Sequence, residues 1–211
     1  MEEFFDLSQP LETGMTIFPG DPDIHLQMAQ GVVEPWRVTA LQLGTHSGTH
    51  IDAGSHYFPQ GKTIDAYPIN RFIIPGVVIE IPSLLEDQAI LADACLEGLK
   101  NLPRGGAVLI RTDWSRFWNT ERYLRHPHLS LEAASLLANN MASLVGIDSL
   151  NVDSTVQGTD QVHQLLLGQE ILIVENLARL SQLLPGKIYR FSFLPLRWKG
   201  LDGSPIRAVA W

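Results

Sequence analysis

The chain has 211 residues, of which 45% are hydrophobic and 18% are charged, and its formal net charge is −8 at pH 7. These proportions are ordinary for a globular protein, and the length predicts a single domain over residues 1–211 with a real core. An acidic chain without a dense Lys/Arg cluster excludes nucleic acid as an expected partner. No apolar run approaches the roughly 18 residues of a membrane helix, so we expect no membrane partner.

The N-terminus and the cysteine content predict a cytoplasmic protein. The opening residues MEEFFDLSQP are acidic and lack the basic and apolar regions of a signal peptide. The one cysteine, Cys95, lies in an apparent helix and cannot form an internal disulfide, as is usual in a reducing compartment.

The first half of the chain contains three predicted strands and one predicted helix. Residues 37–43 alternate apolar and polar side chains, which predicts a half-buried strand. Residues 76–81 and 107–112 are short, apolar and rich in β-branched side chains, as buried strands are. Between them, residues 87–102 space their apolar side chains at three and four, which predicts a helix that ends before PRGG.

The second half continues this alternation. Residues 130–144 predict a helix with Ser130 as its N-cap, and residues 160–168 predict a shorter helix ending at Gly168. We also expect buried strands over residues 144–148 and 171–176. A C-terminal hairpin should pair residues 188–196 with residues 205–211. The sum is an α/β chain with a mixed sheet and few helices.

Chemically distinctive side chains cluster in GTHSGTHIDAGSHYF, residues 44–58. His46, His50, Asp52 and His56 fall within eleven residues, although the whole chain has only seven histidines. Imidazole and carboxylate groups are good ligands for zinc and similar divalent ions. The glycines and β-branched residues disfavour a helix here and favour a strand end leading into a loop. In an extended segment, His50 and Asp52 would point to the same side.

A serine hydrolase is the rival interpretation of this stretch. Ser47 and Ser55 are possible nucleophiles beside a histidine base. Neither lies in the G-x-S-x-G turn that joins a strand to a helix in such enzymes. The residues therefore favour a metal site.

Glu175 is a second chemically unusual residue. It ends an apolar predicted strand, and a charge at a buried strand end needs a partner. His163, in the predicted helix just before this strand, is near enough in sequence to share a site. From these residues alone, Glu175 is either a metal ligand or an exposed strand terminus.

These residues resemble the cyclase family of metal-dependent hydrolases, which includes bacterial kynurenine formamidases and isatin hydrolases. The family signature is His-x-Gly-Thr-His-x-Asp-x-Pro-x-His, and the chain reads HSGTHIDAGSH from His46 to His56. The resemblance extends to FPGDP (18–22), VGIDSLNVD (145–153) and VHQLLL with IVENL (162–177). It therefore covers nearly the whole chain and implies a swivelling β/β/α fold.

The resemblance also implies separate roles for the residues of the site. His46, His50 and Asp52 resemble ligands of a first divalent metal, and Asp52 would bridge to a second ion. His56 resembles the proton donor and acceptor, and Phe18 an aromatic residue that lines the substrate pocket. The second ion would be held also by His163 and Glu175.

The implied activity is hydrolysis of the C–N bond of an amide or formamide, as in the conversion of N-formylkynurenine to kynurenine and formate. The implied cofactor is two Zn²⁺ ions per subunit, with Mn²⁺ as the alternative, and the implied assembly is a homodimer or homotetramer. The alternatives are hydrolysis of a cyclic amide or lactone, as by isatin hydrolases, and a non-catalytic metal-binding protein.

Two positions depart from the family pattern. Gly54 replaces the proline of the signature and gives more backbone freedom just before His56. Phe18 lacks the indole N–H of the tryptophan in formamidases. We also expect Thr49, Asp148 or Asp153 to orient the metal ligands through hydrogen bonds.

Overall fold

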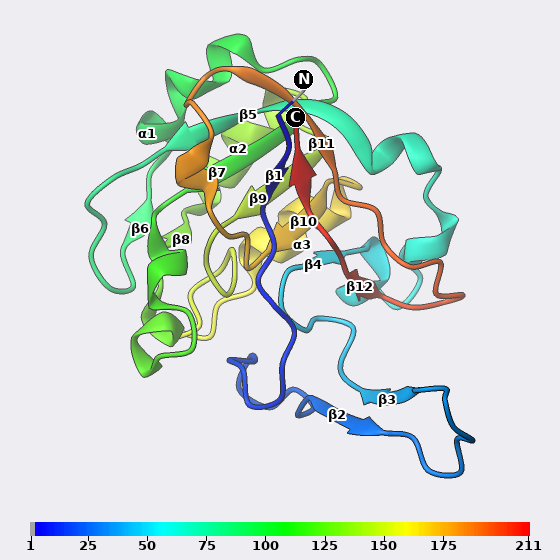
Figure 1. Cartoon of the computed structure of the whole chain (residues 1–211). Coiled ribbons are helices and arrows are strands. Elements are labelled where there is room, and N and C mark those ends of the chain that lie inside the picture. Colours follow the sequence, from blue (N-terminus) through cyan, green and yellow to red (C-terminus); the bar gives the residue numbers. More distant parts are fainter. Residues whose placement is uncertain (1–2) are drawn as a thin grey trace.

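A nine-stranded mixed sheet joins the two ends of the chain in the computed structural model, which describes residues 3–211 (Figure 1). The strand order is β1-β13-β11-β5-β7-β9-β10-β4-β12. The central strands β5, β7, β9 and β10 run parallel, and the outer strands pair antiparallel. The strands are β1 (Phe5–Asp6), β4 (His50–Asp52), β5 (Ile73–Glu80), β7 (Ala107–Arg111), β9 (Leu144–Ile147), β10 (Leu172–Glu175), β11 (Ile188–Ser192), β12 (Gly203–Pro205) and β13 (Val209–Ala210).

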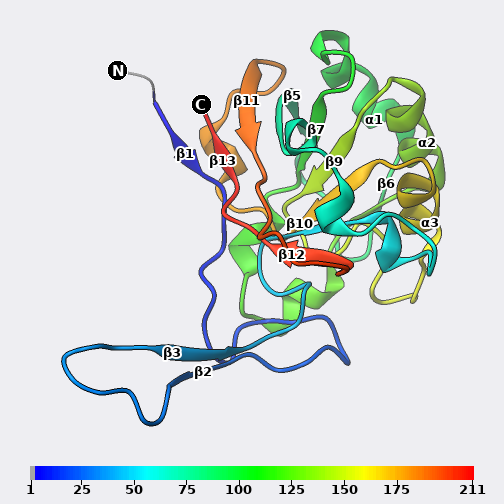
Figure 2. The same cartoon turned by 90° about the vertical axis from the view of Figure 1, so that its right-hand side faces the viewer.

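Four further strands form two separate pairs. β2 (His25–Met28) pairs with β3 (Thr39–Gln42), and β6 (Ala89–Ile90) pairs with β8 (His128–Leu129). In Figure 2 the β2–β3 hairpin projects away from the body of the molecule as an arm.

Three α-helices lie within the described residues: α1 (Ala92–Leu96), α2 (Leu131–Asn139) and α3 (Gln161–Gly168). Their apolar side chains join those of the central strands in one core, which includes Val108, Leu137 and Leu166. A second core contains side chains such as Leu109 and Phe191, with alternate residues of β7 belonging to the two cores. Short 3-10 helices occupy Gly54–His56, Ile64–Ala66, Ile69–Arg71, Gly98–Asn101, Trp114–Phe117, Glu121–Arg125 and Leu180–Gln182.

The expected α/β class, with a mixed sheet and few helices, is confirmed. The predicted buried strands correspond to β5, β7, β9 and β10. Ser130 caps α2 as predicted, because its hydroxyl accepts a hydrogen bond from the backbone N–H of Ala133 at 3.1 Å. The helix predicted over residues 160–168 is α3. Since β1 and β13 pair within one sheet, we propose that residues 1–211 form a single domain.

Three predicted elements need correction. The helix predicted over residues 87–102 begins only at Ala92, because Ala89 and Ile90 pair with β8 instead. It ends at Leu96, and a separate 3-10 helix follows over Gly98–Asn101. The helix predicted over residues 130–144 ends at Asn139, and Leu144 already belongs to β9. Of the strand predicted over residues 37–43, only Thr39–Gln42 form β3, and its side chains are exposed rather than half-buried, since β3 pairs only with β2 in the arm.

The two arms of the predicted C-terminal hairpin do pair, because β11 pairs antiparallel with β13. The segment between them, however, contains β12 (Gly203–Pro205), which pairs with β4 at the opposite edge of the sheet. No helix within the described residues has both the length and the apolar character needed to cross a membrane.

Candidate active site

Strand β4 brings two of the expected ligands to one side of the sheet. His50 and Asp52 are two residues apart in an extended segment, so their side chains share a face, as predicted. The antiparallel register with β10 pairs His50 with Glu175. His50 Nε2 lies 3.4 Å from Glu175 Oε2 and 3.3 Å from Asp52 Oδ1. The alternative of an exposed strand terminus at Glu175 is wrong, because this carboxylate is buried.

His46 and His56 come from the segments on either side of β4. His46 precedes the strand, and its Nδ1 lies 2.7 Å from Asp52 Oδ1. His56 ends the 3-10 helix Gly54–His56, and its ring centroid lies 3.9 Å from that of His46. The ring of His46 also packs against β12, where a Cβ on Gly203 would meet His46 Cε1 at 2.8 Å.

Gly54, the departure from the family signature, has a structural reason. Its backbone N–H donates to the hydroxyl of Tyr67 at 3.2 Å, a bond that proline could not make. The next two N–H groups donate to Lys62 O at 3.1 Å and Ala53 O at 2.9 Å. Hydrogen bonds thus hold the segment that carries His56.

α3 presents His163 from the other side of the cluster. Its Nε2 lies 3.7 Å from Asp52 Oδ2 and 3.5 Å from Glu175 Oε1. Its Nδ1–H donates to Asp153 Oδ2 at 2.8 Å. Asp153 also accepts from the backbone N–H groups of Val162 and His163, in the first turn of the helix. Asp153 therefore orients His163 as expected of it.

The buried carboxylates stabilise positive charge at the centre of the cluster. Burial alone would lower the pKa of His46, but Asp52 and Asp202 outweigh it and raise this pKa to about 9. Burial likewise opposes charge on His163, yet Asp153, Asp52 and Glu175 raise its pKa to about 10. The same carboxylates would stabilise a divalent metal, which would displace the proton from each ligating imidazole.

The donor atoms fit such a metal. Oδ2 of Asp52 is buried and has no hydrogen-bond partner, which is costly unless a cation binds there. Asp52 belongs to both groups of side chains whose donor atoms lie within 4.8 Å of one another. One group adds His46 and His56, and the other adds His50 and Glu175. The chain thus has the residues of a metal site centred on Asp52.

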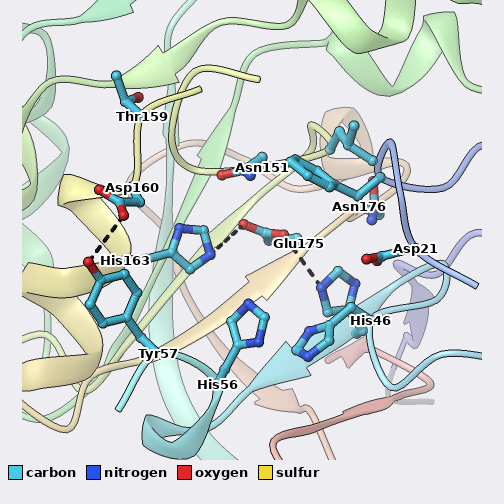
Figure 3. A pocket seen from close by; sticks show the side chains of 13 residues that line it. Asp21, His46, His56, Tyr57, Asn151, Thr159, Asp160, His163, Glu175 and Asn176 are labelled. Carbon is cyan, nitrogen blue, oxygen red and sulfur yellow. Dashed lines mark hydrogen bonds and ion pairs between the residues drawn. The ribbon is translucent and has the colours of Figure 1, made fainter. Parts of the chain in front are cut away.

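A cavity of about 260 Å³ opens beside this cluster (Figure 3). His56 faces it between His46 and Tyr57 in the close view, and burial lowers the pKa of His56. Phe18 also lines the cavity, with 37% of the residue exposed. The remaining lining residues are Asp21, His46, His50, Tyr57, Leu150, Asn151, Thr159, Asp160, His163, Glu175 and Asn176.

Thr49 and Asp148, which were expected to orient metal ligands, make hydrogen bonds elsewhere. The hydroxyl of Thr49 donates to the carbonyl of Asn176 at 2.6 Å and thereby ties the start of β4 to the end of β10. Asp148 accepts two bonds from Thr112, through its N–H at 2.8 Å and its hydroxyl at 2.6 Å. Neither side chain contacts a metal-site residue among the described hydrogen bonds and ion pairs.

The serine hydrolase alternative is not supported. The buried hydroxyl of Ser55 has no hydrogen-bond partner, and no described hydrogen bond joins Ser47 to a histidine. The aromatic residues of the loop near Trp114 form a small core with Leu150 and are not among the residues that line the cavity.

The local sequence pattern did not point to Asp202 or Asn176. Asp202 lies in the turn-rich segment RWKGLDGS, where an aspartate is ordinary, yet its Oδ2 lies 3.0 Å from His46 Nε2. Asn176 links the hydroxyl of Tyr123 to the carbonyl of Gly48 through bonds of 2.9 Å each. His50 Nδ1–H donates to that same carbonyl at 2.8 Å. The signal for Asn176 was only its position next to Glu175.

Comparison with known proteins identifies the family. A model of the Cyclase family, described as "Putative cyclase", matches residues 5–154. The chain belongs to this family. The resemblance read from the histidine motif is thereby confirmed, and two residues of the cluster, His163 and Glu175, lie beyond the matched segment.

Individual relatives match over almost the whole chain. A kynurenine formamidase of Bacillus cereus is 31% identical over 211 residues, covering 98% of this chain and 96% of its own. A solved structure of a potential metal-dependent hydrolase with cyclase activity aligns with a TM-score of 0.81 at 25% identity, covering 99% and 96% of the two chains. Isatin hydrolase A of Labrenzia aggregata, bound to benzyl benzoate, shares the fold with a TM-score of 0.86 at 24% identity, covering 99% and 93%.

We expect His50→Ala to abolish binding of divalent metal, because the variant removes a donor at the centre of the cluster. Elemental analysis after loading with Zn²⁺ and dialysis measures the metal retained. His25→Ala, on the exposed strand β2, is the control and should retain as much metal as the wild type. Equal metal content in the two variants would contradict the assignment of His50.

Asp148→Asn should stabilise the protein at alkaline pH. Burial raises the pKa of Asp148 to about 6, above its ordinary value near 3.8. The contribution of this carboxyl to stability is therefore fully present below about pH 4 and is lost as the pH rises through about 6. A pKa shift of this size corresponds to about 3 kcal/mol in the free energy of unfolding.

Urea unfolding at several pH values measures this effect. The amide oxygen that Asp148→Asn introduces can still accept from Thr112, so this variant should exceed the wild type by about 1–3 kcal/mol at pH 8 and match it near pH 4. Asp23→Asn, at an exposed loop position, controls for the lost charge. If the free energies of unfolding of Asp148→Asn and the wild type differ by the same amount at every pH, burial of the charge is not the cause of the difference.

Proposed function

We propose that this protein is a metal-dependent hydrolase that cleaves the C–N bond of an amide, with an arylformamidase-like activity on N-formylkynurenine. The observation that carries the proposal is a buried cluster of His and carboxylate donors centred on Asp52, with His56 facing the adjoining cavity. The kynurenine formamidase of Bacillus cereus, similar over almost its whole length, supports this reaction.

We assign the metal ligands as follows. His46, His50 and Asp52 would hold one ion, and Asp52, His163 and Glu175 would hold a second. Asp52 lies in both groups of close donor atoms, one with His46 and His56 and the other with His50 and Glu175. His163 Nε2 also lies 3.7 Å from Asp52 Oδ2, so these contacts support a place for Asp52 in both ligand sets. The donors suit two Zn²⁺ ions, with Mn²⁺ as the alternative, since imidazole and carboxylate serve both metals.

His56 is assigned the proton transfer. The metal, when bound, supplies a Lewis acid that polarises the substrate carbonyl and acidifies water. Water oxygen forms a bond to the formyl carbon, the C–N bond breaks, and the products are formate and an aryl amine. His56 takes a proton from the water and delivers it to the leaving nitrogen. Burial lowers its pKa, so its ring is neutral and able to accept a proton near pH 7.

Phe18 is assigned to the aromatic part of the substrate. It lines the cavity from the segment that leads into β2, apart from the metal cluster. An aromatic ring can stack on an aryl group without a hydrogen bond, so the missing indole N–H does not prevent binding of an aryl formamide.

His56→Ala should lower kcat for N-formylkynurenine by about 10²–10⁴-fold, which is the usual contribution of a general acid or base. Bound metal should remain, because the assigned ligands are intact. The assay uses Zn²⁺- or Mn²⁺-loaded protein, with release of formate as the readout and isatin as a comparison substrate. His25→Ala is the control. Full turnover by His56→Ala would refute its role in proton transfer. If the wild type hydrolyses no amide, lactam or lactone, the proposal that the protein is a hydrolase is refuted.

We also propose that copies of the chain associate as a homodimer or homotetramer in the cytoplasm. The arm exposes large apolar side chains: Met28, Val33, Trp36, Val38 and Leu41. An apolar patch on a projecting hairpin is costly in water and is typical of a surface that contacts another protein. The cytoplasmic location rests on the cysteine content and stays a prediction.

Trp36→Ser combined with Leu41→Ser should weaken this association, because both side chains are more than half exposed in the single chain. Light scattering coupled to size-exclusion chromatography measures the molar mass. Leu85→Ser is the control, since Leu85 is similarly exposed outside the arm. A monomeric wild type at high concentration would exclude the assembly.

A further inference from the structure

The carboxylate of Asp202 lies between two histidines with different assigned roles. Its Oδ2 is 3.0 Å from Nε2 of His46, an assigned metal ligand, and 3.5 Å from Nδ1 of His56, the assigned proton carrier. The hydroxyl of Thr45 donates to the other oxygen, Oδ1, at 3.0 Å. Thr45 thus fixes the carboxylate so that Oδ2 faces the two rings.

The turn that carries Asp202 does not need this carboxylate for its own structure. The backbone carbonyl of Asp202 accepts from Ala53 N–H at 2.9 Å, and the carbonyl of Leu201 accepts from Ile64 N–H at 2.8 Å. Oδ1 of Asp65 accepts from Gly200 N–H at 2.9 Å. Since these bonds hold the loop, the side chain of Asp202 is free to serve the site.

The other two histidines of the cluster, His50 and His163, are each oriented by an acceptor of their own. His50 donates through Nδ1 to the carbonyl of Gly48, and His163 donates through Nδ1 to Asp153. In each case Nε2 is left facing Asp52 or Glu175. Metal-binding histidines commonly use their second nitrogen in this way, which fixes the tautomer and strengthens the ligand.

We propose that Asp202 is a positioning residue that orients both His46 and His56. By accepting the Nε2–H of His46, it leaves Nδ1, which faces Asp52, as the nitrogen available to the metal. By facing Nδ1 of His56, it leaves Nε2 of that ring for proton transfer. One carboxylate thereby couples metal binding to proton transfer. This inference rests on the proposed function, but its metal-binding part can be tested without substrate.

The first experiment measures Zn²⁺ affinity by competition with a chromophoric chelator. Asp202→Ala should bind Zn²⁺ about 10–100-fold more weakly than the wild type, which is the usual effect of removing such a partner. Asp202→Asn keeps the shape of the side chain and one acceptor oxygen, so its Zn²⁺ affinity should lie between those of the wild type and Asp202→Ala. Asp65→Asn is the matched control, since Asp65 fastens the same loop without contacting the cluster, and its Zn²⁺ affinity should equal that of the wild type.

The second experiment separates orientation from mere loop stability. Long-range ¹H–¹⁵N spectra of the Zn²⁺-loaded protein with labelled histidine identify the protonated ring nitrogens, which we expect at Nε2 of His46 and Nδ1 of His56. Asp202→Ala should make these rings sample both tautomers, whereas Asp65→Asn should not. With saturating metal, kcat should fall about tenfold or more in Asp202→Ala, with KM unchanged.

Unchanged Zn²⁺ affinity and unchanged tautomers in a folded Asp202→Ala protein would overturn the proposal. Equal losses in Asp202→Ala and Asp65→Asn would also overturn it, because the loop rather than the carboxylate would then be responsible. If Asp202→Ala does not fold, Asp202→Asn gives the same comparisons. A wild type that binds Zn²⁺ but hydrolyses no amide would refute the proposed function and leave the affinity test of Asp202 intact.

Discussion

The buried carboxylate of Asp52 is the group on which the rest of the site depends. It lies against His46, His50 and His163, which come from three different segments of the chain. A charge in this position is costly unless every neighbour compensates it, and removing one partner of such a cluster is strongly destabilising. A turn, a strand and a helix thus converge on Asp52, and its buried Oδ2, which has no hydrogen-bond partner, is left to a cation.

Backbone pairing gives this cluster its rigidity. The short strand β4 lies between β10 and β12, so both of its edges are hydrogen-bonded. Gly48 supports the approach to β4 with a φ of +61°, a conformation that glycine adopts readily. Gly203 leaves room for the ring of His46. Donor atoms held by a sheet move less than donors on loops, which suits a preorganised metal site.

The wall of the cavity is built differently from the metal cluster. Phe18 and Asp21 belong to the segment that enters the arm, and neither belongs to the nine-stranded sheet. Tyr57 and Asp160, joined by a hydrogen bond of 3.1 Å, form another part of the wall near the start of α3. Substrate preference can thus change through these loops while the donors around Asp52 stay fixed, as is common where function lies on loops above a rigid scaffold.

The sequence by itself determined the local chemistry. The spacing of His50 and Asp52 placed both on one face of a strand, and the whole histidine motif predicted the family and its metal-dependent chemistry. Only the tertiary structure decided that Glu175 faces His50, that Asp202 reaches His46, and that Ala89–Ile90 form a strand with β8. Side-chain periodicity follows from local backbone geometry, whereas contacts between distant segments depend on strand register and on the packing of the whole core.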